Sequence, residues 1–202
     1  MAGSRLIYLL RHGRIQNSGE QRRYIGQLDV PLDPEGIRQA ERLRERLAPV
    51  EFQKIFCSDL ERSRETARIL AGANAGEVVV CPELREIHLG EWEGMSFAEV
   101  VRRFPEKFEA RGRDIAYYRI AGGESFADCA QRMLPAYQKI VAEKADPVAI
   151  VGHAGVNRLI LCHLLGMPIA NLFRIVQDFA CVNVIQYNGV NPQVRLINAV
   201  AV

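Results

Sequence analysis

Val148-Ala149-Ile150-Val151-Gly152-His153 is the stretch of sequence that says most about the fold. Its unbroken apolar run predicts a strand buried on both faces, because a half-buried strand would alternate apolar and polar side chains. Apolar residues at helical spacing follow as far as Leu165, and Gly166 is a helix stop signal. A buried strand that leads directly into a helix is typical of an α/β protein.

Further strands are expected on both sides of this one. They are short apolar or β-branched runs bounded by turn residues. The last two flank an Asn188-Gly189 turn signal, which predicts a hairpin. The expected strands are Arg5–Leu10, Lys54–Cys57, Val78–Cys81, Val182–Tyr187 and Gln193–Asn198.

Helices are predicted between these strands, where apolar residues recur at helical spacing after a capping residue. One begins after Asp33-Pro34, and another begins at Ser125. Ser58 and Ser96 each precede a Glu by three residues, the spacing of a capping box. Pro105 is expected to end the helix that Ser96 opens. No repeat or linker divides the chain, so we predict one α/β domain over residues 1–202 with a mainly parallel sheet.

The composition is that of a globular protein with a balanced charge. The 202 residues are 49% hydrophobic, and 26 Lys and Arg against 24 Asp and Glu give a net charge of +2. This balance predicts no nucleic acid and no membrane as partner. The apolar runs are too short to span a bilayer, and no signal peptide precedes the first strand, so a cytoplasmic location is expected. The five cysteines include no C-x-x-C pair and are expected to be reduced.

Three predicted strand ends carry residues suited to anion chemistry. The first ends in Arg11-His12-Gly13, the second leads to a helical turn with Arg62, and the buried strand ends at His153. Ligands of open α/β sheets bind outside the carboxyl ends of the strands. Arginine matches phosphate or carboxylate, and helix N-termini add amide donors. The pattern predicts an anion site with nucleophilic or acid–base histidines.

Each of these residues has a plainer interpretation when it is taken alone. A histidine at a strand end is more often an ordinary hydrogen-bonding residue, and an isolated arginine is usually a surface charge. The prediction depends on two strand–His–Gly junctions in one short chain. His163, among apolar helical neighbours, is interpreted as structural, whereas His88 beside Glu86 fits either role.

Several other site types lack their sequence patterns. The chain contains no H-E-x-x-H, no EF-hand loop, no P-loop, no G-x-G-x-x-G and no G-x-S-x-G. We therefore expect no metal site, no dinucleotide cofactor and no α/β-hydrolase serine.

Six blocks of sequence, in order, resemble the histidine phosphatase (phosphoglycerate mutase-like) superfamily. The resemblance covers nearly the whole chain and implies a three-layer α/β/α domain with an antiparallel edge to its sheet. The blocks are Leu10–Gly13, Gly26–Leu32, Ser58–Ala67, Leu84–Gly94, Gly122–Ser125 and Val151–Gly155.

The resemblance also implies a mechanism. His12 would attack a phosphomonoester and form a phosphohistidine, and Glu86 would protonate the leaving oxygen, with Glu91 or Glu93 as alternatives for the acid. Fixed positive charge is the main requirement of phosphoryl transfer, and nearby arginines also lower the pKa of a nucleophilic histidine. The residues expected to hold the phosphoryl group are Arg11, Arg62 and His153, and further substrate contacts are expected from Asn17, Ser18, Gly26 and Ala154.

The loop after Gly13 departs from the family pattern. It reads Arg14-Ile15-Gln16-Asn17-Ser18, which leaves open whether Asn17 or Ser18 contacts phosphate. Arg14, Arg22 and Arg23 add charge nearby. They would either bind a second anionic group of the substrate or be solvated surface residues.

The compact segment Ser96–Ala121 resembles the short phosphatase branch, which includes broad-specificity and α-ribazole phosphatases. The resemblance implies a metal-independent phosphomonoesterase, without a cofactor, that acts on a small phosphorylated metabolite, with α-ribazole 5'-phosphate as one candidate. A monomer or homodimer is expected. A cofactor-dependent phosphoglycerate mutase and a catalytically silent phospho-ligand-binding relative are the alternatives.

Overall fold

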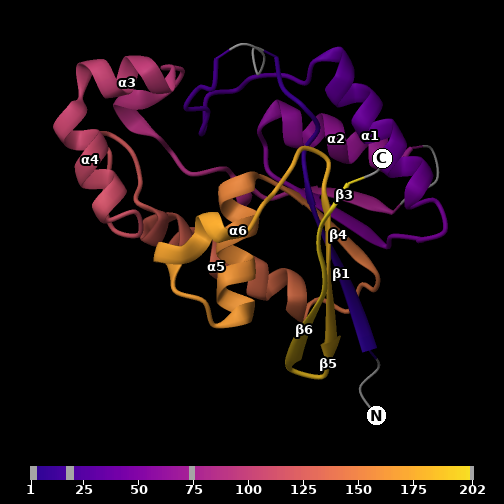
Figure 1. The fold of residues 1–202 in the computed structure, drawn as a ribbon. Helices are drawn as coiled ribbons and strands as arrows, with labels where there is room; N and C mark the ends of the chain where they lie inside the picture. The colour runs from indigo at the N-terminus through magenta and orange to yellow at the C-terminus, as the bar shows by residue number, and fades with distance from the viewer. Residues whose placement is uncertain (1–3, 17–20, 73–75, 201–202) are drawn as a thin grey trace.

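A mixed β-sheet forms the centre of the molecule (Figure 1). The computed structural model describes residues 4–16, 21–72 and 76–200. Within these ranges the sheet has six strands in the order β3-β2-β4-β1-β5-β6. The first four are parallel neighbours, and β5 runs antiparallel to both β1 and β6. The strands are β1 (Ser4–Arg11), β2 (Lys54–Cys57), β3 (Glu77–Val80), β4 (Val148–Gly152), β5 (Val182–Asn188) and β6 (Asn191–Ala199).

Helices cover both faces of this sheet and complete three layers. Helices α1 and α2 pack on one face and α5 and α6 on the other, while α3 and α4 lie to one side, at the upper left of Figure 1. This architecture confirms the predicted three-layer α/β/α fold, in which a mainly parallel sheet has an antiparallel edge. The helices are α1 (Pro34–Arg46), α2 (Glu61–Ala71), α3 (Phe97–Arg103), α4 (Pro105–Arg113), α5 (Phe126–Ala142) and α6 (Ala154–Leu165), with 3₁₀ turns η1 (Pro82–Leu84), η2 (Gly90–Trp92) and η3 (Ile169–Arg174).

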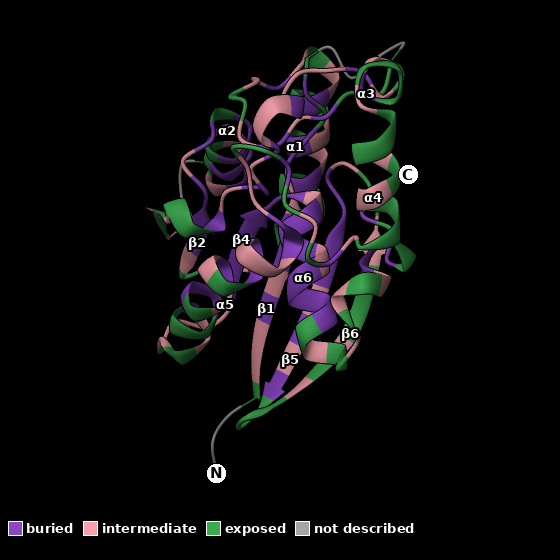
Figure 2. Cartoon of the chain, turned by 90° about the vertical axis from the view of Figure 1, so that its left-hand side faces the viewer, coloured by how far each residue is buried: buried purple, intermediate pink, exposed green. Residues whose placement is uncertain are grey.

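Strand β4 is the most deeply buried element, and all its residues are buried (Figure 2). Val148 and Ile150 face the α5–α6 side, whereas Ala149 and Val151 face the α1–α2 side. Because both faces are covered, the strand needs apolar side chains at every position. Its carboxyl end, at Gly152, is therefore fixed by the core.

Most predicted helix caps are present. Asp33 accepts a hydrogen bond from the Gly36 amide at 2.7 Å, and Ser96 and Glu99 form the reciprocal bonds of a capping box. Gly166 ends α6 in the left-handed conformation, with φ of 62°. The sequence signals for these helix ends are confirmed.

Two local predictions are corrected by the structure. Ser58 and Glu61 do not form a capping box, because the Glu61 amide donates to Asp29 at 2.8 Å and Ser58 bonds elsewhere. Pro105 does follow the end of α3, but it also begins α4, a helix that the sequence pattern missed. A proline is well tolerated at the first position of a helix because the missing amide would have no intrahelical acceptor there.

The described ranges hold no helix that is both long and apolar enough to cross a membrane. The five cysteines are free thiols, as expected.

Candidate active site

The sheet places His12 and His153 side by side. Strands β1 and β4 are parallel, and Arg11 pairs with Gly152 in their register. The next residue of each strand is a histidine, and the His12 amide still donates to the Gly152 carbonyl at 3.2 Å. The two ring centroids lie 5.1 Å apart, and both side chains are buried. The predicted convergence of the two histidines is confirmed.

The hydrogen bonds of His12 fix its tautomer. Its Nδ1 lies 2.8 Å from the Gly13 carbonyl oxygen, which can only accept, so Nδ1 carries the proton. The lone pair of the ring is then on Nε2. Burial, followed by the charges of Arg62 and Arg11, holds the pKa of His12 well below its ordinary value. The imidazole is neutral at pH 7, as a nitrogen nucleophile must be.

His153 presents a donor instead. Its Nε2 lies 2.8 Å from the Ser58 hydroxyl, and that hydroxyl already accepts from the Leu60 amide at 3.3 Å. Among the described residues the Ser58 hydroxyl has no other acceptor for its proton, so it donates to His153 Nε2, which leaves Nδ1–H as a donor. Nδ1 is buried and has no hydrogen-bond partner in the described part of the chain. Burial and then Arg62 hold the pKa of His153 well below its ordinary value.

Two guanidinium groups, one from the buried Arg62 and one from the partly buried Arg11, complete this set of donors. Arg62 donates to the carbonyls of Gly26 at 2.6 Å and Leu28 at 2.9 Å. Arg11 donates to the Gln177 carbonyl at 2.6 Å and stacks 3.8 Å from the centroid of Phe179. Burial lowers the pKa of Arg11 to about 10, so it remains a cation at neutral pH.

Arg11 and Arg62 share a feature with His153. In each guanidinium the Nε atom is buried and has no partner among the described residues. A buried donor without an acceptor is destabilising by about 1–3 kcal/mol, more if charged, and an anion with several oxygens would relieve all three at once. The donor set fits a phosphoryl group.

Glu86 lies at the N-terminus of α6, next to these donors. Its Oε2 accepts from the Gly155 amide at 2.8 Å, and its Oε1 accepts from the Ile87 amide at 2.9 Å. A Cβ on Gly155 would lie 2.4 Å from Oε1, so this approach requires glycine. Glu86 interacts electrostatically with both Arg11 and Arg62.

The other two carboxylates considered for the acid are committed elsewhere. Glu93 accepts from the amides of Gly26, Gln27 and Leu89 at 2.7–3.0 Å. Glu91 is paired with Lys107 at 2.7 Å. Of the three carboxylates, Glu86 is the one that acts electrostatically on both Arg11 and Arg62, so it fits the role of acid.

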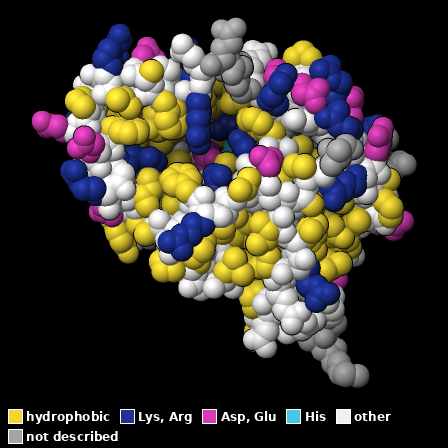
Figure 3. Space-filling model, in the orientation of Figure 1, with side chains coloured by type: hydrophobic (Ala, Val, Ile, Leu, Met, Phe, Trp, Pro, Cys, Tyr) yellow, Lys and Arg dark blue, Asp and Glu magenta, His cyan; other side chains and the backbone are white. Residues whose placement is uncertain are grey.

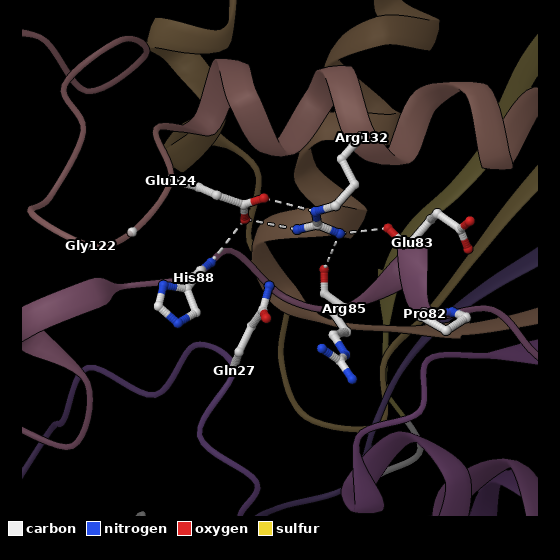
Figure 4. Close-up of a pocket in the computed structure, with 9 residues that line it drawn as sticks. Gln27, Pro82, Glu83, Arg85, His88, Gly122, Glu124 and Arg132 are labelled. Atoms are coloured by element: carbon white, nitrogen blue, oxygen red, sulfur yellow. Dashed lines mark hydrogen bonds and ion pairs between the residues drawn. The ribbon is translucent and has the colours of Figure 1, made fainter.

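An ion pair between Arg132 on α5 and Glu124, which precedes that helix, holds the backbone that carries Glu86 (Figure 4). Arg132 donates to the carbonyls of Glu83 at 2.6 Å and Arg85 at 3.1 Å. Its other nitrogens bond Glu124, which also accepts from the His88 amide at 3.0 Å. These contacts border a cleft of about 520 Å³. The pair fixes the backbone on both sides of Glu86.

The remaining predicted site residues have different outcomes. Gly26 contacts the site through its backbone, because its carbonyl oxygen accepts a hydrogen bond from Arg62. Ala154 is the first residue of α6, directly after His153. Asn17 and Ser18 lie outside the described residues, and their predicted phosphate contact stays a prediction.

The residues that the sequence left open have other partners. Arg14 pairs with Asp33 at 2.6 Å and Arg23 donates to the Gly94 carbonyl, whereas Arg22 stacks on Phe97. The ring atom Nδ1 of His88 accepts a hydrogen bond from the Gly90 amide at 3.3 Å. His163 is exposed on α6 rather than packed in the core.

The face of the molecule drawn in Figure 3 is hollowed near its upper centre. Lys and Arg side chains stand at the rim of the hollow, and acidic and histidine side chains are visible within it. In the described ranges, no group of three or more His, Cys, Asp or Glu side chains is placed to hold a metal ion.

Some residues of the site could not be found from the sequence. Gln177 and Phe179 hold Arg11 from the segment before β5, and Ser58 orients His153. Ser58 does follow a strand end, which is a weak signal. The contact of Gln177 with Arg11 is through its backbone, which leaves no trace in residue type.

Known proteins resemble this chain over most of its length. The model of the histidine phosphatase superfamily, branch 1, matches residues 7–200. The chain is 29% identical over 201 residues to an adenosylcobalamin/alpha-ribazole phosphatase of Escherichia coli, covering 97% of each. It is 37% identical over 176 residues to a glucosyl-3-phosphoglycerate phosphatase of Mycolicibacterium vanbaalenii, covering 83% of this chain and 77% of that protein. The solved alpha-ribazole phosphatase of Shigella flexneri superposes with a TM-score of 0.89 at 29% identity, covering 98% of both chains.

Proposed function

The chain belongs to the histidine phosphatase superfamily and is a phosphoric monoester hydrolase, and we propose that it works without a metal ion, through a phosphohistidine on His12. The observation that carries this proposal is the state of His12. The ring is neutral and its Nδ1 proton is held by Gly13, so the lone pair of Nε2 is available next to three buried donors.

In the first step, Nε2 of His12 attacks the phosphorus atom. The N–P bond forms while the bond from phosphorus to the ester oxygen breaks. Glu86, in its protonated form, gives its proton to the departing oxygen, which leaves as the alcohol. Arg11, Arg62 and His153 donate hydrogen bonds to the three equatorial oxygens, where negative charge is concentrated in the transition state.

In the second step, water takes the place of the alcohol. Glu86, now a carboxylate, accepts a proton from the water as its oxygen attacks phosphorus. The N–P bond breaks, inorganic phosphate leaves, and both His12 and Glu86 return to their starting protonation states. No electron acceptor or further reactant is needed.

For the substrate we propose a small phosphorylated metabolite. The similarity to an alpha-ribazole phosphatase over 97% of the chain supports α-ribazole 5'-phosphate as one candidate. The higher identity to a glucosyl-3-phosphoglycerate phosphatase, over a smaller share of the chain, supports a phosphorylated glycerate as another. Both relatives are named as phosphatases, which favours hydrolysis over phosphoglycerate isomerisation.

A catalytically silent phospho-ligand-binding relative is the remaining alternative. His12, Arg62, Glu86 and His153 are present and buried, and Arg11 is present and partly buried, which argues against it. Such a relative would bind phosphate but would not turn over.

The experiment is turnover of p-nitrophenyl phosphate combined with trapping of the intermediate. The protein, treated with a chelator, is expected to release nitrophenolate and to carry ³²P after rapid alkaline denaturation, in which phosphohistidine survives. His12→Ala should abolish both signals, and His163→Gln, at an exposed histidine, is the matched control. Activity that returns only with added Mg²⁺, Mn²⁺ or Zn²⁺, or label retained by His12→Ala, would contradict the mechanism.

A further inference from the structure

Arg111 on α4 is a half-buried cation without a counter-ion. Its guanidinium lies 5.6 Å from the centroid of Phe126 and 6.0 Å from those of Tyr24 and Trp92. In the described part of the chain it makes no hydrogen bond and no ion pair. Burial lowers its pKa, and the groups that act on it electrostatically are tyrosines rather than carboxylates. The three aromatic rings stabilise this charge in part, and a ligand of opposite charge would compensate it further.

The side chain of Phe126 connects Arg111 to Glu86, the proposed general acid, because it lies close to both. A Cβ built on Gly155 would lie 2.4 Å from Glu86 Oε1 and 3.3 Å from Phe126 Cε1, so the edge of Phe126 lies beside the Glu86 carboxylate. The guanidinium of Arg111 is on this same ring. Phe126 therefore lies between the Arg111 guanidinium and the carboxylate that, in the proposed mechanism, protonates the departing oxygen.

Two further arginines stand around the same aromatic side chains. Arg158 on α6 lies 5.4 Å from Phe173, which in turn packs edge-on against Phe126 at 5.7 Å. Arg158 interacts electrostatically with both Glu86 and Arg22. Arg22, which stacks 4.8 Å from the centroid of Phe97, also acts on Tyr24, as Arg111 does.

The state of Arg22 and Arg158 distinguishes them from the arginines that are ion-paired on the rest of the surface. The guanidinium of Arg22 has no hydrogen bond or ion pair among the residues described. Arg158 donates one hydrogen bond, from Nε to the Ile175 carbonyl at 2.7 Å. Its other N–H groups have no acceptor among the described residues. By contrast, Arg14, which the sequence analysis grouped with Arg22 and Arg23, is paired with Asp33 at 2.6 Å.

We propose that Arg111, together with Arg22 and Arg158, forms a second anion subsite, and that the substrate is a phosphomonoester whose alcohol part carries a second negative charge such as a carboxylate. The inference rests on the proposed phosphatase function and narrows its substrate class. Guanidinium groups bind carboxylates through paired charged hydrogen bonds, and the surrounding rings keep them oriented. A substrate with an uncharged alcohol part would leave these cations unmatched.

The test compares 3-phosphoglycerate with glycerol phosphate, in which a hydroxymethyl group replaces the carboxylate. The transferred group and the leaving oxygen are the same type in both. We expect kcat/KM to favour 3-phosphoglycerate by about tenfold or more, the effect of one charged hydrogen bond. Arg111→Met, which keeps apolar bulk against the rings, should lower this ratio by about fivefold or more, and Arg111→Lys should retain part of it.

Arg113→Gln is the matched control, because it removes the same charge from the same helix at an exposed position. If Arg111 only covers the aromatic cluster, Arg111→Met will lower the melting temperature and leave the substrate ratio unchanged, which would overturn the inference. Arg22→Gln, at an exposed residue, tests the ratio again should Arg111→Met fail to fold.

Binding to the His12→Ala variant, measured by calorimetry, separates the inference from the proposed function. Preferred binding of 3-phosphoglycerate without turnover by the wild type would support the subsite and contradict the phosphatase mechanism. Turnover of both substrates at equal kcat/KM would contradict the subsite alone. The absence of both binding and turnover would contradict both.

Discussion

Acidification should destabilise this protein through two buried histidines. His12 and His153 are neutral in the folded state, and their pKa values lie well below the 6.5 of a free imidazole. In the unfolded chain both take up protons near pH 6.5. The unfolded state therefore binds more protons as the pH falls, so stability is complete above about pH 6.5 and is lost as the pH falls toward the folded-state pKa values.

The size of this effect follows from the number of groups. One pKa unit corresponds to about 1.4 kcal/mol, so each histidine that stays neutral in the fold contributes about 1.4 kcal/mol of lost stability between pH 7.5 and 5.5. The two together contribute about 2.7 kcal/mol, a large share of a stability of about 5–15 kcal/mol.

Urea unfolding at pH 7.5 and 5.5 measures the effect directly. His12→Asn and His153→Asn should each reduce the pH-dependent difference by about half, with His163→Gln as the control. Added inorganic phosphate should shrink the difference further, because a bound dianion favours protonated imidazole. An identical pH dependence in the wild type and both site variants would refute the assignment of two buried neutral rings.

Three further outcomes test the reaction itself. Glu86→Gln should slow hydrolysis of alkyl phosphates by about 10²–10⁴-fold and that of p-nitrophenyl phosphate much less, since a nitrophenolate needs little protonation; equal losses would assign Glu86 to binding. Gly155→Ala should cause a loss with the same leaving-group dependence, of about 10²-fold, because its Cβ would displace a carboxylate oxygen 2.4 Å away; unchanged rates would show that the contact is dispensable. With 3-phosphoglycerate and a trace of 2,3-bisphosphoglycerate, phosphate release should exceed isomerisation, and isomerisation about tenfold faster would instead identify a mutase.

The strands and the central residues of the site could be predicted together, because the site residues stand at the carboxyl ends of the predicted strands. A buried apolar run that ends in Gly-His predicts β4, and a similar run predicts β1. The carboxyl ends of parallel strands lie at the same edge of a sheet. The proximity of His12 and His153 could therefore be predicted without knowing how the strands pair. The family resemblance added the role of Glu86, which no periodicity indicates.

Other features depend on contacts that sequence spacing does not encode. Ser58 and Glu61 have the spacing of a capping box, yet Asp29, distant in the chain, accepts the Glu61 amide. Arg132 holds the Glu86 segment through backbone carbonyls, and any residue type provides a carbonyl. Arg111 was missed because Pro105 was interpreted only as a helix end, although the same residue begins α4.

The position of α3 and α4 beside the sheet has a consequence for how such a protein diverges. His12 and His153 extend the central strands, so a change in their surroundings disturbs the core as well as the reaction. No residue of α4 is fully buried, and in α3 only Val100 is. Surface substitutions usually change stability by less than about 0.5 kcal/mol. If Arg111 binds the alcohol part as proposed, substitutions on α4 can change substrate recognition at little cost in the stability of the fold.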